Sequence, residues 1–134
     1  MARRVKISTI GAVPPGVPSH LEEQALVDNM IQFWRRQFDQ VLPDQPDLIV
    51  VPEMCDRYGG QSPEQAARYY QVRGEQVLEF FSEVARDRGC YMAYSAAREA
   101  KDGTWRNSTL IIDRSGNVTG TYNKNHVVIE ETTA

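Results

Sequence analysis

The sequence is short of the features that mark secreted or membrane-inserted proteins. It holds only two cysteines, Cys55 and Cys90, in 134 residues. Two cysteines are too few for a disulfide framework, so we expect a reducing, cytoplasmic location. No apolar run approaches the roughly 18 residues that a membrane-spanning helix needs, so we expect no membrane partner. Residues 1–16 alternate polar and apolar side chains and contain two adjacent prolines, which predicts a strand and a loop rather than a signal peptide.

An excess of charge of one sign is also missing. The 15 basic and 18 acidic residues leave a net charge of -3, whereas a nucleic-acid-binding surface would need a basic stripe or patch. The sequence therefore predicts no nucleic-acid partner. A length of 134 residues with 41% hydrophobic side chains is enough for one domain with one core.

The spacing of apolar residues predicts alternating strands and helices. Two helices are expected to open at the capping sequences that begin with Ser19 and Ser62, and to run to Val41 and Gly89. Strands are expected over residues 5–10, 48–51, 90–95, 108–113 and 118–122. This order, β-α-β-α-β-β-β, predicts an α/β fold with parallel pairing in its first half and an antiparallel hairpin later.

Two charged residues fall where an α/β sheet binds its ligands. Glu53 follows the apolar run Leu48–Val51, and Lys124 follows the last predicted strand. Ligands bind at the carboxyl ends of strands in open α/β sheets. A carboxylic acid that is partly desolvated at a strand end has a raised pKa and can act as a base, and a lysine can stabilise an oxyanion. The plainer alternatives are a solvated or helix-capping acid and an exposed loop lysine.

Cys55 is a second candidate for chemistry, because a thiolate beside a base can act as a nucleophile. It lies two residues after Glu53, so the two side chains point the same way in an extended segment but not necessarily in a turn. Cys90 opens a predicted strand and is expected to be a small buried hydrophobic residue. His126 and Glu130 have the i,i+4 spacing of a metal pair but no further ligand, so we predict neither a metal nor a cofactor.

Three segments together resemble the carbon–nitrogen hydrolases, the nitrilase superfamily. They are "LIVVPEMC", "NSTLIIDRSGNVTGTYNK" and "GTYNKNHVVIEE", and the separation of Glu53 from Lys124 also fits. The resemblance implies hydrolysis of non-peptide carbon–nitrogen bonds in amides, N-carbamoyl compounds or nitriles. It also implies a four-layer α-β-β-α sandwich. The run "KNHVVIEE" favours an amide or N-carbamoyl substrate over a nitrile.

The resemblance also implies roles for individual residues. Glu53 would be the general base, Lys124 would stabilise the tetrahedral intermediate, and Glu130 would be a second catalytic Glu, with Glu131 as its rival. The family's nucleophilic Cys lies beyond its lysine motif, and this sequence ends at Ala134. Residues 1–134 are therefore expected to be the N-terminal part of the domain. We expect half of the sandwich, a mixed sheet with helices on one face.

Half a sandwich would leave an apolar sheet face uncovered, so we expect this chain to associate. Members of the family commonly dimerise, so the resemblance implies a homo-oligomer. The expected partner of the intact enzyme is a small amide, carbamoyl or nitrile substrate. A different class of function stays open, in which the chain is a non-catalytic binding or assembly module with a relic site. The lack of the nucleophile within these residues favours that alternative.

Overall fold

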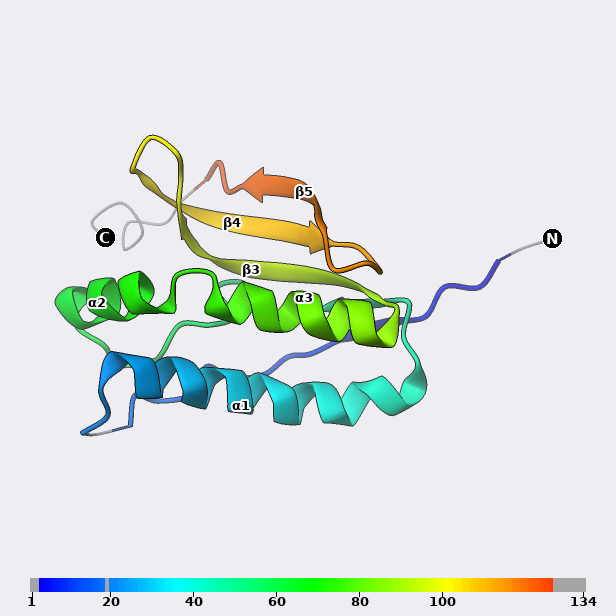
Figure 1. Cartoon of the computed structure of the whole chain (residues 1–134), viewed down its shortest axis with the longest axis horizontal. Helices are drawn as coiled ribbons and strands as arrows, with labels where there is room; N and C mark the ends of the chain where they lie inside the picture. The colour runs from blue at the N-terminus through cyan, green and yellow to red at the C-terminus, as the bar shows by residue number, and fades with distance from the viewer. Residues whose placement is uncertain (1–2, 19, 127–134) are drawn as a thin grey trace.

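A single mixed β-sheet with helices packed on one face forms the fold (Figure 1). The structure is a computed structural model and describes residues 3–18 and 20–126. The helices are α1 (Glu23–Val41), α2 (Pro63–Arg73) and α3 (Gln76–Arg88), with a short 3-10 turn at Leu42–Asp44. The strands are β1 (Ile7–Thr9), β2 (Leu48–Val50), β3 (Tyr91–Glu99), β4 (Trp105–Ile112) and β5 (Val118–Asn123).

The five strands lie in the sheet in the same order as in the sequence. β1, β2 and β3 are parallel, and β4 and β5 each run antiparallel to the strand before. This confirms the predicted mixed sheet with a parallel first half. Because β5 again runs in the direction of β3, the carboxyl ends of β2, β3 and β5 and the start of β4 share one edge of the sheet. That edge carries the candidate site.

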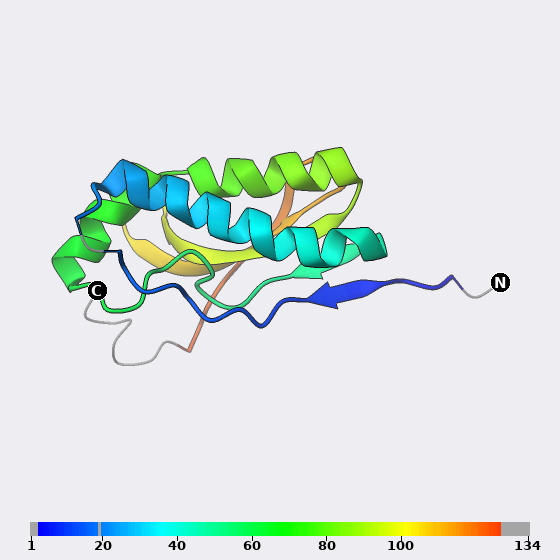
Figure 2. The ribbon, with the colours of Figure 1, turned by 90° about the horizontal axis from the view of Figure 1, so that it is seen from below.

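The helical layer covers only one face of the sheet (Figure 2). An aromatic cluster joins the two layers, in which the rings of Phe38 from α1 and Phe81 from α3 lie 4.9 Å apart. Phe81 lies equally close, 4.9 Å, to Tyr94 of β3. Aromatic rings at these distances contribute both buried area and specific edge-to-face contacts. Two layers, one of helices and one of strands, agree with the predicted half of a four-layer sandwich.

The other face of the sheet is open, since no helix among the described residues packs on it (Figure 2). The register of the strands places alternate side chains on it, and several are large, apolar and exposed. They are Ile7 (56% exposed), Tyr91 (39%), Ile111 (37%) and Tyr122 (56%). A face this apolar is typical of a surface that packs against something else.

Two predicted helix features differ from the structure. The segment that opens at Ser62 forms two helices, because Gly74 adopts a positive φ of 45° and ends α2. Glycine reaches this conformation without steric cost, and the apolar spacing continued across it. The first helix begins at Glu23 with Glu22 as its N-cap residue and no side-chain capping bond. Ser19, the predicted cap, lies outside the described residues, whereas the capping box of Ser62 and Gln65 is present.

Candidate active site

Glu53 sits in a tight turn immediately after β2. The turn reverses at Met54, whose φ of 52° is unusual for a residue with a side chain. Ser95 of β3 fixes this turn through two hydrogen bonds. Its Oγ accepts the backbone N–H of Met54 at 3.1 Å, and its carbonyl oxygen accepts the N–H of Cys55 at 2.8 Å. The turn therefore presents Glu53 over the open face of the sheet, from a backbone that is fixed by β3.

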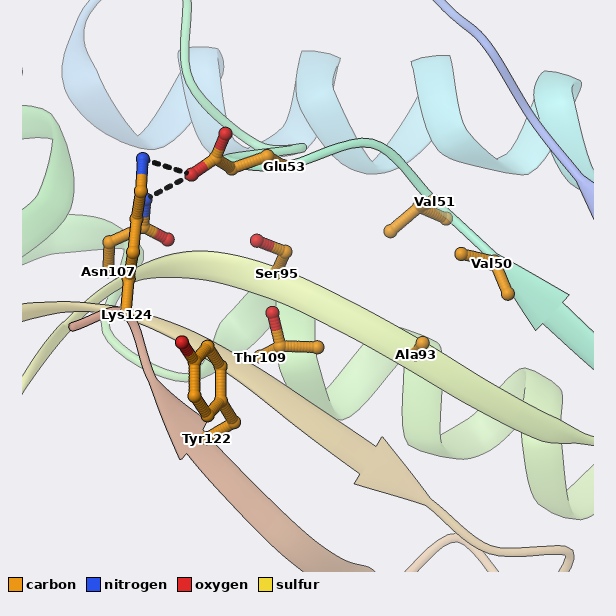
Figure 3. A pocket seen from close by; sticks show the side chains of 9 residues that line it. All are labelled: Val50, Val51, Glu53, Ala93, Ser95, Asn107, Thr109, Tyr122 and Lys124. Carbon is orange, nitrogen blue, oxygen red and sulfur yellow. Dashed lines mark hydrogen bonds and ion pairs between the residues drawn. The ribbon is translucent and has the colours of Figure 1, made fainter. Parts of the chain in front are cut away.

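Two side chains, one from β4 and one from the residue after β5, contact the Glu53 carboxylate (Figure 3). The Nζ of Lys124 lies 2.8 Å from Oε1, and the Nδ2 of Asn107 donates to the same oxygen at 2.7 Å. Asn107 lies at the start of β4 and Lys124 directly follows β5, so both belong to the edge at which β2 ends. The structure thus brings together the two residues that the sequence singled out, with an asparagine that it did not.

These side chains border a half-open hollow of about 310 Å³ on the open face. Its floor is formed by small and apolar side chains of the strands (Figure 3). Its polar wall is formed by Glu53, Asn107 and Lys124, which we call the Glu53 cluster. The lining residues are Val50, Val51, Glu53, Ala93, Ser95, Asn107, Thr109, Tyr122 and Lys124. Apolar walls with a few convergent polar groups are typical of a small-molecule site.

The desolvation expected of Glu53 is limited among the described residues. Its side chain is 57% exposed, whereas that of Lys124 is 26% exposed. The reason is geometric, because the turn carries Glu53 out of the plane of the sheet and over its open face (Figure 3). Its carboxylate pairs with the Lys124 ammonium and accepts a hydrogen bond from the neutral Asn107 amide.

The structure disagrees with the reading in which Cys55 is a nucleophile. The turn at Met54 sends the Cys55 side chain into the core, where the residue is only 3% exposed, while Glu53 faces outward. Burial, followed by the nearby Asp56 carboxylate, raises the pKa of this thiol well above its ordinary value. The prediction for Cys90 is confirmed, since it is 1% exposed and in the core.

A buried ion pair below the Glu53 turn was not predicted from the sequence. The carboxylate of Asp56 accepts two bonds from Nη1 of Arg73, at 3.1 and 3.2 Å, and a third from the Tyr94 hydroxyl at 2.6 Å. The Tyr69 hydroxyl donates to the Asp56 backbone carbonyl at 2.8 Å. Burial raises the pKa of Asp56, while Arg73 and Tyr94 act in the opposite direction and favour the charged carboxylate. The sequence does not reveal this cluster, because its members come from three separate segments, the turn after β2, α2 and β3.

The second catalytic Glu that the resemblance implies lies outside the described residues. Glu130 and Glu131 lie outside the described residues, so the choice between them stays a prediction, and the i,i+4 spacing of His126 with Glu130 also involves a residue outside them. Within residues 3–18 and 20–126, no three His, Cys, Asp or Glu side chains gather as a metal site. None of the helices described in this range is long and apolar enough to cross a membrane.

Comparison with models of known protein families shows to which family the chain belongs. The model of the family described as carbon-nitrogen hydrolase matches residues 11–134. The chain belongs to the carbon–nitrogen hydrolase family. The resemblance found in the sequence is therefore confirmed. No curated protein sequence matches the chain.

Solved structures of carbon–nitrogen hydrolases share the fold. A carbon-nitrogen hydrolase from Helicobacter pylori superposes with a TM-score of 0.64 at 16% identity, over 94% of this chain and 41% of that one. An N-terminal amidase gives 0.74 at 20% identity, over 96% and 29% of the two chains. A variant of the amidase from Nesterenkonia sp., in complex with butyramide, gives 0.68 at 19% identity, over 97% and 47%. The chain thus spans less than half the length of these three carbon–nitrogen hydrolase structures.

Proposed function

We propose that this chain supplies the general base and the oxyanion-stabilising cation of a thiol-dependent amidohydrolase. The observation that carries the proposal is the 2.8 Å contact between Glu53 and Lys124 at the rim of an apolar hollow. A carboxylate and an ammonium that meet at the carboxyl edge of an α/β sheet are placed for acid–base chemistry on one small molecule. Family membership supports the reaction class, the hydrolysis of a carbon–nitrogen bond.

The nucleophile would be a Cys that follows residue 134 in the complete protein. Glu53 would take the thiol proton while the sulfur forms a bond to the carbonyl carbon of the substrate. The resulting oxyanion would be stabilised by Lys124. Glu53 would then return its proton to the leaving ammonia or amine, and the carbon–nitrogen bond would break. Water would attack the thioester with Glu53 again as base, which releases the carboxylic acid and restores the thiol.

We propose a short amide or N-carbamoyl compound as substrate, ahead of a nitrile. The small hollow supports a compact acyl group, and the butyramide bound to the Nesterenkonia amidase variant is a molecule of that size. Glu130 is proposed as the second catalytic Glu, with Glu131 as the alternative. The cytoplasmic location and the homo-oligomeric state stay predictions.

The proposal is tested on the complete protein that contains this chain. Glu53→Gln and Lys124→Met should each lower ammonia release from butyramide by about 10²–10⁴-fold, the usual contribution of a general base or an oxyanion donor. The matched controls Glu83→Gln on α3 and Lys101→Met in the turn before β4 are exposed and should retain activity. Turnover that survives Glu53→Gln would disprove the base assignment. A protein that binds amides but never releases ammonia would favour the binding-module alternative.

A further inference from the structure

Asn107 is tied to the proposed base as closely as the lysine is. Its Nδ2 donates to Oε1 of Glu53 at 2.7 Å, and Nζ of Lys124 lies 2.8 Å from the same oxygen (Figure 3). The pairing of β4 with β5 sets the two donors side by side, because the backbone N–H of Lys124 donates to the Asn107 carbonyl at 2.9 Å. The two donors therefore hold the carboxylate from one direction.

The two donors are not equivalent, however. The lysine ammonium ends a flexible four-carbon stem, whereas the asparagine amide is separated from its strand by one methylene group. The strand itself is fixed, since Asn107 pairs with Ala97 of β3, and the next residue, Ser108, donates its hydroxyl to the Asn123 side chain at 2.6 Å. A short side chain on a fixed strand can keep a carboxylate in one orientation better than a long one can.

We propose that Asn107 is a positioning residue whose amide keeps the Glu53 carboxylate oriented and charged while Lys124 turns to the developing oxyanion. This inference rests on the proposed function, because it names the group that orients the proposed base. An amide suits the task, since it donates to a carboxylate without carrying a proton that Glu53 could take. Lys124 alone cannot hold Glu53 and neutralise an oxyanion with full effect at both places.

The test compares three variants of the complete protein by the pH profile of kcat/KM for butyramide hydrolysis. Asn107→Ala removes the donor, and Asn107→Asp replaces it with a carboxylate of the same size. Asn117→Ala is the matched control, because Asn117 is exposed at the opposite end of the β4–β5 hairpin and its backbone bonds survive the change. Carbon-13 titration of the Glu53 carboxyl by NMR gives a second reading that needs no turnover.

A hydrogen bond to a carboxylate favours its charged form, so its loss moves the acid limb to higher pH. We expect a shift of about one pH unit in Asn107→Ala and a larger one in Asn107→Asp. At a pH on that limb, kcat/KM should fall about tenfold in Asn107→Ala, and the control should match the native protein. A merely structural role would lower activity equally at all pH values.

The inference and the proposed function fail in different ways. An acid limb that stays in place in both Asn107 variants, while Glu53→Gln is inactive, overturns the role of Asn107 and leaves the function standing. Turnover that persists in Glu53→Gln overturns the function. The NMR titration tests the contact between the two residues without turnover, since an unchanged Glu53 midpoint in Asn107→Ala refutes the inference and a raised midpoint supports the part in which Asn107 keeps Glu53 charged.

Discussion

Arg73 and Asp56 form an ion pair that is almost completely withdrawn from water, with Nη1 3.1 Å from Oδ1 and side-chain exposures of 3% and 0%. Asp56 lies three residues after Glu53, in the same turn, and Arg73 is the last residue of α2. The pair therefore connects the end of a helix to the segment that presents the proposed base. Burying two charges costs free energy of folding. We therefore expect this pair to fix the position of the Glu53 turn against α2 rather than to add net stability.

Asp56→Asn should be among the most destabilising single changes in this chain. It leaves the Arg73 guanidinium buried without its countercharge, which costs about 3–5 kcal/mol of unfolding free energy. Urea denaturation followed by circular dichroism measures the change. The exposed pair of Glu23 and Arg68 offers the control, because Glu23→Gln should leave stability almost unchanged. Equal effects of the two variants would show that the buried pair has no special role.

Both thiols should resist modification in the folded protein. Cys55 and Cys90 are buried, and burial raises the pKa of each, so little reactive thiolate is present at pH 8. Iodoacetamide should label neither within the time that it labels both in urea, as read by mass spectrometry. Selective, rapid labelling of native Cys55 would revive its candidacy as a nucleophile.

Gly116 should tolerate alanine less well than Gly103 does. Both glycines have a φ of +82°, so an added Cβ strains the backbone equally, by about 1–2 kcal/mol. At Gly116 the new atom would also lie 2.8 Å from the backbone oxygen of Ser82 in α3, whereas at Gly103 nothing lies within 4 Å. Gly116→Ala should therefore cost about 1–3 kcal/mol more in thermal or urea unfolding. Indistinguishable variants would mean that the hairpin does not dock on α3 this closely.

Asp47 should make stability depend on acid pH. Its carboxylate accepts the backbone N–H of Lys6 at 2.9 Å and Nη2 of Arg114 at 2.8 Å, and these bonds, the first more than the second, lower its pKa. A lowered folded-state pKa adds stability above the ordinary value of 3.8, and this is lost as the pH falls through the lowered value. Asp47→Asn should be less stable than the native protein at pH 7, and the difference should shrink below pH 4. A constant difference across that range would rule out the linkage.

The open sheet face should drive association of the 134-residue chain. Ile111→Lys places a charge in the middle of this face and should weaken self-association in sedimentation equilibrium. Val72→Lys changes a residue of similar exposure, 41% against 37%, but on α2, and should have no such effect. A chain that sediments as a monomer at high concentration would contradict the prediction, because the apolar face would then be stable in water.

Periodic burial explains why most of the fold could be predicted from the sequence. Leu48–Val50 is a short apolar run between turn residues, and α1 carries its buried residues at three- and four-residue spacing. Both patterns follow from the geometry of a single element. The break at Gly74 was missed because the apolar spacing continues through it, and only the positive φ of that glycine shows that the helix stops.

The candidate site was predicted only in part, for a related reason. Glu53 and Lys124 each follow a strand, which is a local signal that one sequence can show. Asn107 gives no such signal, since an asparagine in a strand is ordinary until its partner across the sheet is known. The Asp56–Arg73 pair was missed because burial of a charge depends on packing among α2, β3 and the turn.

The arrangement of the Glu53 cluster also sets an order of events during synthesis. Asn107 lies 54 residues after Glu53, and Lys124 comes later still. At about 5–20 residues per second, Glu53 leaves the ribosome about 3–11 s before Asn107 does. The parallel core of β1, β2 and β3 can pair in that interval, but the hairpin that carries both donors can dock only at its end. The proposed base therefore meets Asn107 and Lys124 only after β4 and β5 have been synthesised. A chain interrupted before Trp105 would carry Glu53 with neither of these two donors.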